Sequence, residues 1–184
     1  MAVTTPEAEL GRPALPFSLP STSGETVTLE SARGPKGLLV VFMCNHCPYV
    51  KAIIDRLIRD ASDLKALGIN TVAISANDPV THPEDSFDNM TAWAEAKRFP
   101  FPYLFDESQE VARAYGAVCT PDFFGYDADL KLRYRGRLDE SKRDTAPEGA
   151  RRELFEAMKE VAETGETTIQ QIPSMGCSIK WKAA

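Results

Sequence analysis

The chain has 184 residues, 43% of them hydrophobic and 26% charged, and a formal net charge of −6 at pH 7. This length and composition are those of an ordinary folded protein, so we expect one domain over residues 1–184. The negative charge disfavours a general attraction to nucleic acid or to anionic membranes. The N-terminus resembles no secretory signal, and no apolar run approaches the roughly 20 residues that span a bilayer. The sequence therefore predicts a cytoplasmic protein that binds neither nucleic acid nor membrane.

The first part of the chain predicts a short hairpin and a central strand. Residues 1–37 are rich in Pro, Ser, Thr and Gly, and two apolar stretches, Leu15–Leu19 and Val27–Leu29, flank the turn-like Gly24. The run Leu38–Met43 is continuously apolar, which is typical of a strand buried on both faces of a sheet. We therefore expect an N-terminal hairpin extension followed by the central strand of the sheet.

A long helix and several shorter elements are predicted after this strand. Apolar residues recur at helical spacing from Pro48 until Gly68, which favours an amphipathic helix, and Ile69–Ser75 reads as a second buried strand. Strand, helix and strand in this order indicate a right-handed parallel crossover. The remaining predicted elements are a helix ending before Phe99, a strand at Tyr103–Phe105, a helix at Asp106–Tyr115, an antiparallel strand pair at Asp122–Tyr126 and Lys131–Leu138, and a helix from about Pro147 to Glu163.

Neither repeats nor linkers divide the chain, and the predicted core covers about residues 12–163. The tail, residues 165–184, has no readable periodicity. Within the core, Lys131, Arg133, Arg135 and Arg137 alternate with apolar residues, which predicts a charged solvent face on a strand; a binding patch is the alternative. The sequence thus predicts an α/β fold with a central mixed sheet flanked by helices, an N-terminal hairpin and a C-terminal tail.

The sequence Cys44-Asn45-His46-Cys47 lies between the central strand and the long helix. The unpaired amides and positive dipole of a helix start favour a thiolate, so we expect Cys44 to be the nucleophile and Cys47 the resolving thiol of a disulfide exchange. A donating His46 would stabilise the Cys44 thiolate and move the potential toward the roughly −180 mV of protein disulfide isomerase, away from the roughly −270 mV of thioredoxin. The alternative for His46 is an exposed spacer.

Two other interpretations of the cysteine pair stay open. Cys44 and Cys47 are half of a zinc site in the first, and simply buried thiols in the second. A tetrahedral site needs four ligands, and no second paired motif exists, so we expect redox chemistry and no metal. The residues available to complete a zinc site are His46, His82, Cys119 and Cys177.

These features together resemble the thioredoxin superfamily, in particular small proteins related to its alkyl hydroperoxide reductase and thiol-specific antioxidant (AhpC/TSA) branch. The resemblance rests on the Pro13–Leu29 hairpin, on Leu38–Met43 with the cysteine motif, and on Val118-Cys119-Thr120-Pro121. It implies a cis peptide bond between Thr120 and Pro121 that faces the cysteine pair, and a Thr120 backbone edge that holds an extended substrate. The segments Phe42–Lys51 and Gly176–Lys182 are similar to a bacterial subgroup labelled thioredoxin-like or thiol-disulfide isomerase.

The resemblance implies an enzyme that reduces or isomerises protein or small-molecule disulfides without a cofactor, supplied by an electron donor that the sequence does not identify. Three residues of related families are missing. Peroxiredoxins have Thr and Pro where this chain has Cys44 and Val40, and thioredoxins have a buried acid where it has Leu38. Asp78 lies near the predicted site, but a turn role in Asn77-Asp78-Pro79 is favoured.

Cys119 and Cys177 are candidate accessory thiols. A small, semi-buried side chain is favoured for Cys119, and a structural tail anchored by Trp181 is favoured over a redox role for Cys177. Two alternative functions remain beside thiol-disulfide exchange. One is a thiol peroxidase of peroxiredoxin type that uses Cys47; the weaker one is a metal-binding chaperone for copper or zinc.

Overall fold

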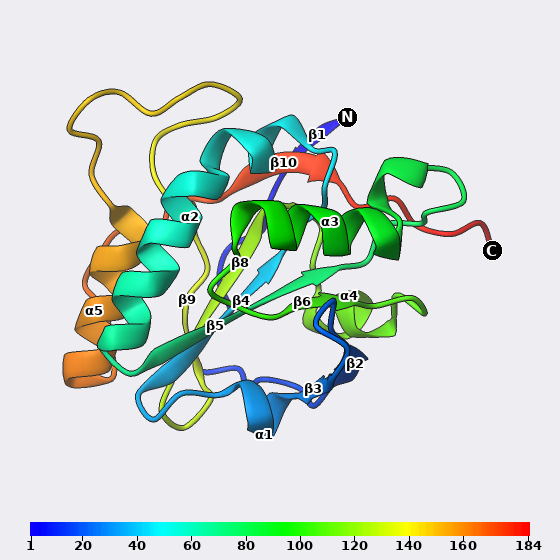
Figure 1. Cartoon of the computed structure of the whole chain (residues 1–184). Coiled ribbons are helices and arrows are strands. Elements are labelled where there is room, and N and C mark those ends of the chain that lie inside the picture. The colour runs from blue at the N-terminus through cyan, green and yellow to red at the C-terminus, as the bar shows by residue number, and fades with distance from the viewer.

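The computed structural model describes all 184 residues, which form a central sheet covered on both faces (Figure 1). No helix is both long and apolar enough to cross a membrane. In chain order the elements are β1 (Ala2–Thr4), β2 (Ser18–Pro20), β3 (Thr26–Thr28), α1 (Leu29–Ala32), β4 (Gly37–Phe42), α2 (Pro48–Ala66), β5 (Ile69–Ser75), the 3₁₀ turn η1 (Pro83–Asp85), α3 (Phe87–Lys97), β6 (Tyr103–Phe105), α4 (Glu110–Tyr115), β7 (Cys119–Thr120), β8 (Asp122–Asp127), β9 (Leu132–Tyr134), α5 (Glu153–Thr164) and β10 (Met175–Ser178).

The main sheet has five strands in the order β6-β5-β4-β8-β9. Strand β4 pairs in parallel with β5 and antiparallel with β8, so the sheet is mixed, as predicted. Every residue of β4 is buried, which explains its continuously apolar sequence. The predicted central strand and the parallel crossover through α2 are confirmed.

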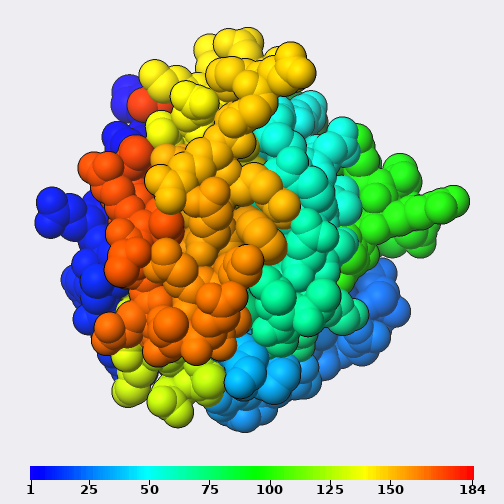
Figure 2. Space-filling view, turned by 90° about the vertical axis from the view of Figure 1, so that its left-hand side faces the viewer, coloured from blue at the N-terminus to red at the C-terminus, as the bar shows by residue number.

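Side chains of β4 alternate between two cores. Leu39 and Val41 face the core that is shared with α2 and α5, whereas Leu38, Val40 and Phe42 face the core under the β2–β3 hairpin and α4. Figure 1 shows α2, α3 and α5 on one side of the sheet and α1, α4 and the hairpin on the other. Figure 2 shows α5 in orange lying directly against α2 in cyan. Strand β4 is therefore buried between the two layers. The cysteine motif follows its carboxyl end and so lies at one end of the sheet.

A second sheet, which the sequence did not predict, forms at that end of the main sheet. It has the order β1-β10-β7, and all its pairs are antiparallel. The C-terminal tail continues across the molecule after β10, where Trp181 packs against the core and lies under the Arg113 guanidinium at 4.2 Å. The tail is therefore docked on the domain along most of its length.

The structure corrects one prediction about the basic residues between Lys131 and Arg137. Strand β9 covers only Leu132–Tyr134, and a register irregularity interrupts its pairing with β8 at Gly125. Arg135 does not lie on a solvent face: its side chain is 8% exposed and pairs with the fully buried Asp122 at 2.9 Å. The alternating pattern predicted a solvent-facing Arg135 because it does not include the buried partner, the Asp122 carboxylate, which lies on the neighbouring strand β8.

Two helices begin later than predicted. Helix α4 starts at Glu110 because Asp106 accepts a hydrogen bond from the Ala112 amide and Gln109 adopts a left-handed conformation, which makes the preceding residues a turn. Helix α5 starts at Glu153, and the residues from Pro147 to Arg152 form a loop. Both corrections shorten a helix at its N-terminus without moving its buried face.

The Arg135–Asp122 pair yields a stability prediction. Replacing Arg135 by alanine leaves the Asp122 carboxylate buried without its partner, which should lower the free energy of unfolding by about 3–5 kcal/mol. Arg133→Ala removes a more exposed partner, that of Asp127, and should cost about 1 kcal/mol or less. Urea unfolding of the reduced protein measures both. Equal losses in the two variants would contradict the assignment of Arg135 to the interior.

Candidate active site

The two motif cysteines lie side by side in the fold, both free thiols with no exposed surface. Cys44 follows the end of β4, and Cys47 is the N-cap of α2. The Cys44 sulfur lies 3.5 Å from the Thr120 hydroxyl, and the Cys47 thiol donates to the Thr120 carbonyl at 3.2 Å. The Thr120–Pro121 peptide bond is cis, as expected. The structure thus brings together the four predicted residues Cys44, Cys47, Thr120 and Pro121.

Helix α2 begins one residue after Cys47, so Cys47 and not Cys44 occupies the helix terminus. Its carbonyl accepts from the Val50 and Lys51 amides, which starts the helix, while its side chain makes no capping bond. The positive end of the helix dipole falls off within the first turn. Helix α2 therefore favours a thiolate on Cys47 more than on Cys44.

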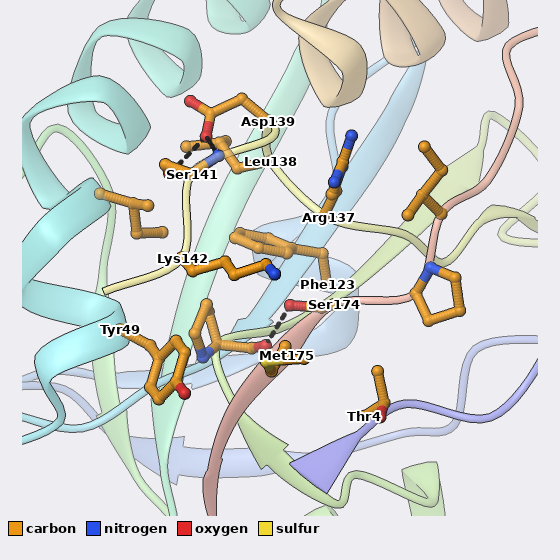
Figure 3. A pocket seen from close by; sticks show the side chains of 14 residues that line it. Thr4, Tyr49, Phe123, Arg137, Leu138, Asp139, Ser141, Lys142, Ser174 and Met175 are labelled. Carbon is orange, nitrogen blue, oxygen red and sulfur yellow. Dashed lines mark hydrogen bonds between the residues drawn. The ribbon is translucent and has the colours of Figure 1, made fainter. Parts of the chain in front are cut away.

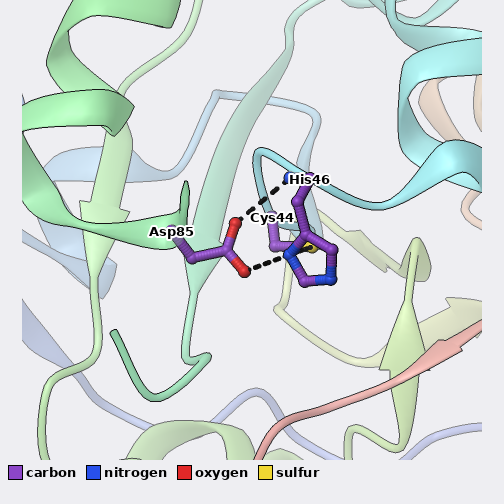
Figure 4. Close-up of side chains that lie close together, drawn as sticks. All are labelled: Cys44, His46 and Asp85. Carbon is purple, nitrogen blue, oxygen red and sulfur yellow. Dashed lines mark hydrogen bonds and ion pairs between the residues drawn. The ribbon is translucent and has the colours of Figure 1, made fainter. Parts of the chain in front are cut away.

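Asp85 is a site residue that the sequence did not identify (Figure 4). It is fully buried at the end of η1, and its carboxylate accepts from the backbone amides of Asn45 and His46 at 2.8 and 3.2 Å. It also accepts from the Asn77 side chain at 2.9 Å and contacts the His46 ring nitrogen Nδ1. The same Nδ1 lies 3.8 Å from the Cys44 sulfur. Asp85 therefore places a buried acid beside the motif, although the position of the thioredoxin acid holds Leu38.

His46 is held in place by these contacts. Its side chain is 22% exposed and its ring stacks on that of His82 at 5.2 Å. The alternative of an exposed spacer is therefore wrong.

Asp78 has the favoured turn role, since its carboxylate accepts from the Val80 amide and the Thr81 hydroxyl. The only sequence signal for Asp85 was its place shortly after the carboxyl end of a buried strand.

The two thiols share one hydrogen bond, which pushes their pKa values apart. The bond to Cys47, burial and the Asp85 carboxylate raise the pKa of Cys44. The same bond lowers the pKa of Cys47 to about 4, against burial, with further hydrogen bonds from Thr120 and Cys177. The pair therefore loses its first proton readily and its second with difficulty, and these directions favour Cys47 as the site of the first thiolate.

Ligand atoms of Cys44, His46 and Asp85 all lie within 4.8 Å of one another, so these residues could hold a metal ion. Three ligands are one fewer than structural zinc sites use. Both carboxylate oxygens of Asp85 already accept two hydrogen bonds each. The geometry therefore fits a hydrogen-bonded thiol site better than a metal site.

The other two cysteines differ in their surroundings. Cys119 is buried, its thiol points at the Pro121 carbonyl at 3.7 Å, and burial raises its pKa. Cys177 is half-buried on β10, opposite Thr120, whose carbonyl accepts from the Cys47 thiol at 3.2 Å. Three of the four thiols thus meet at one place.

Strand β10 corrects one expectation from the resemblance. The backbone edge of Thr120 does not stand open for an extended substrate, because β10 pairs with it at Cys177. Gly176 permits the close approach: a Cβ there would lie 1.9 Å from the Thr120 carbonyl oxygen. The chain's own tail therefore occupies the edge that was expected to bind substrate.

A cavity of about 250 Å³ adjoins this edge (Figure 3). It lies between α2, the loop after β9 and the segment leading into β10, and the Ser174 hydroxyl at its wall donates to the Pro121 carbonyl at 2.7 Å. The labelled lining residues include Tyr49, Lys142 and Met175. Solvent thus comes close to Pro121 on the face of β10 that carries Met175.

The ionisation of the pair predicts an acidic thiolate transition. The thiolate absorbance of the reduced protein should appear well below the ordinary thiol pKa of about 8.5, since a lowered pKa means that the thiolate persists as the pH falls. Cys47→Ser should abolish this transition, and Cys44→Ala should move it to higher pH because the donor to Cys47 is lost. Persistence of the acidic transition in Cys47→Ser would contradict the assignment.

A second prediction concerns Asp85. Asp85→Asn removes the negative charge that raises the pKa of Cys44, so the second thiol of the pair should ionise at lower pH. Asp78→Asn is the matched control, because Asp78 is also buried but serves a turn. Thiolate absorbance against pH measures both variants, and identical curves for Asp85→Asn and the parent protein would refute the charge effect.

Comparisons with known proteins place this chain in a family. The AhpC/TSA family model matches residues 10–135. A conserved protein of Geobacillus kaustophilus is 43% identical, with a TM-score of 0.94 over 100% of this chain and 98% of that chain. The thioredoxin domain of a Bacteroides vulgatus thiol-disulfide oxidoreductase, 17% identical, superposes with a TM-score of 0.59 over 74% of this chain and 91% of that chain, which shows the thioredoxin-like fold.

Two curated relatives carry redox names. The "Putative peroxiredoxin Rv2521" of Mycobacterium tuberculosis is 25% identical over 71% of this chain and 78% of its own length. The thiol-disulfide oxidoreductase ResA of Halalkalibacterium halodurans is 25% identical over 59% of this chain and 57% of its own length. With the family model covering more than half of the chain, this thioredoxin-fold protein belongs to the AhpC/TSA family.

Proposed function

We propose that this protein is a thiol-disulfide oxidoreductase whose Cys44 and Cys47 cycle between a dithiol and a disulfide. The observation that carries the proposal is the contact between two buried thiols whose pKa values are driven apart, beside a cis-proline segment. One thiolate attacks a substrate disulfide, and the second sulfur then attacks the first, which releases the reduced substrate and leaves the Cys44–Cys47 disulfide.

The order of attack expected from the sequence, with Cys44 first and Cys47 resolving, stays a prediction. The ionisation of the reduced pair favours the opposite order. Cys47 lies at the helix terminus and receives the hydrogen bond, whereas Cys44 keeps its proton beside Asp85. In this order Cys44 is the resolving thiol, and the His46–Asp85 pair beside its sulfur is the group placed to receive its proton.

A thiol peroxidase is the second candidate, and the lowered pKa of Cys47 favours it too. Peroxide attack needs one thiolate, and Cys47 occupies the place of the peroxide-reactive cysteine. Cys44 and Val40 stand where peroxiredoxins have Thr and Pro, which supports disulfide exchange instead. Peroxide consumption that survives Cys44→Ser but not Cys47→Ser would identify the peroxidase.

The exchange proposal predicts that both cysteines are required for turnover. Cys44→Ser and Cys47→Ser should each lower reduction of a disulfide substrate, such as insulin or glutathione disulfide, by more than an order of magnitude, because neither single thiol can close the cycle. Steady-state turnover with dithiothreitol as the reductant measures this. Cys119→Ser is the matched control, since its buried thiol donates only to the Pro121 carbonyl, and it should keep the parent activity. Full activity of either motif variant would refute the proposal.

A further inference from the structure

The Cys44–Cys47 pair is closed off from solvent in this fold. Both side chains have no exposed surface, although disulfide exchange requires a sulfur of the partner to approach the attacked sulfur in line. The closure has an identifiable cause: β10 lies along β7, and its Cys177 stands opposite Thr120. A partner in solution therefore meets β10 before it meets the pair.

Strand β10 is firmly built into this position. Gly176 is packed against the Thr120 carbonyl, and β1 pairs with the opposite edge of β10. Beyond the strand, the Ile179 amide donates to the Val118 carbonyl at 3.2 Å, and the Lys180 amide donates to the Asn77 side chain at 2.9 Å. These bonds hold the tail on both sides of Cys177, so its contact with Cys47 is a fixed feature of the fold.

Cys177 is the thiol that lies between the buried Cys44–Cys47 pair and the solvent. It is half-buried, so part of it is accessible from outside, and on the inside it packs against the buried core cluster that contains Cys44 and Cys47. We propose that Cys177 is a third exchange thiol, through which the disulfide of the buried Cys44–Cys47 pair passes to and from thiols in solution. This inference rests on the proposed function of the pair, and it names a thiol as the class of partner that meets the protein at β10.

The exchange balances without any further reactant. The Cys177 thiolate attacks the Cys47 sulfur of the Cys44–Cys47 disulfide; the Cys47–Cys177 bond forms, the old bond breaks, and Cys44 leaves as a thiolate that takes up a proton. A thiol from solution then attacks the Cys177 sulfur, forms a mixed disulfide with it and releases Cys47 as a thiolate. A second thiol attacks the mixed disulfide and frees Cys177, so two outside thiols become one disulfide and the pair gains two electrons.

The charges around Cys177 favour these exchange steps. Burial and the contact with Cys47 raise the pKa of Cys177 to about 11 in the reduced protein, while Lys180 and the N-terminal amine oppose the rise. Formation of the Cys44–Cys47 disulfide removes the Cys47 thiolate, and the two positive groups remain. The Cys177 thiol is therefore easier to ionise when the pair is oxidised, which is the state in which it must attack.

The first test maps the disulfide directly. The full-length Cys44→Ser variant retains Cys47, Cys119 and Cys177, and on oxidation with glutathione disulfide it should form an intramolecular Cys47–Cys177 bond, identified by peptide mass mapping. A bond between Cys47 and Cys119, dimers linked through Cys47, or a persistent free Cys177 would each overturn the relay.

The second test measures turnover. Cys177→Ser should reduce glutathione disulfide more slowly by at least an order of magnitude, while the midpoint of its Cys44–Cys47 couple, measured at equilibrium in glutathione buffers, stays at the parent value. Unchanged turnover would overturn the relay. The unchanged midpoint verifies that the variant is folded, and Cys119→Ser serves as the parallel control. Loss of turnover in Cys44→Ser and Cys47→Ser without loss in Cys177→Ser would leave the proposed function intact and remove only the relay.

Discussion

The geometry of the site depends on the carboxylate of Asp85. The chain must leave the central strand at Phe42 and enter helix α2 at Pro48, and the short connection cannot satisfy its own amides. Asp85 accepts from two of those amides, from Asn77 and from the His46 ring, so one buried side chain fixes the loop that carries the cysteines. Its charge also opposes ionisation of Cys44. The group that shapes the loop thus also makes Cys44 harder to ionise.

The second constraint is the C-terminal strand. Addition of β10 to β7 completes the backbone hydrogen bonds of an edge that would otherwise stand open beside the cis-proline. The same pairing buries the cysteine pair and positions a third thiol on Cys47. An extended polypeptide cannot add to the Thr120 edge while β10 is in place.

The sequence predicted the elements whose patterns are local. Strand β5 has the predicted bounds, and the bounds of β4 and α2 differ from the predicted ones by one residue. This agreement is expected because the hydrophobic pattern of a buried strand or an amphipathic helix is carried by consecutive residues. The cysteine pair was found from its spacing and its place before the helix, whereas the cis-proline segment came from the resemblance to the thioredoxin superfamily. Strand β10 has no readable pattern, since it forms a strand only against β1 and β7, which lie far from it in the chain.

The missed parts of the site have the same physical origin. Asp85 reaches the motif across about 40 residues of sequence, and nothing in its neighbours marks it as buried. Arg135 follows the alternation of a solvent face, yet its partner Asp122 lies inside the fold. Polar residues that are buried in pairs obey no periodicity, so only the tertiary structure identifies them.

The central claim is that Cys44 and Cys47 form a reversible two-electron couple. Equilibration of the parent protein in glutathione redox buffers, followed by alkylation and mass mapping, measures that couple directly. The account predicts one two-electron transition between the dithiol and the Cys44–Cys47 disulfide, at a potential above the roughly −270 mV of thioredoxin, because the stabilised Cys47 thiolate favours the reduced form. The absence of a Cys44–Cys47 disulfide over the whole range, or a potential at or below that of thioredoxin, would contradict it.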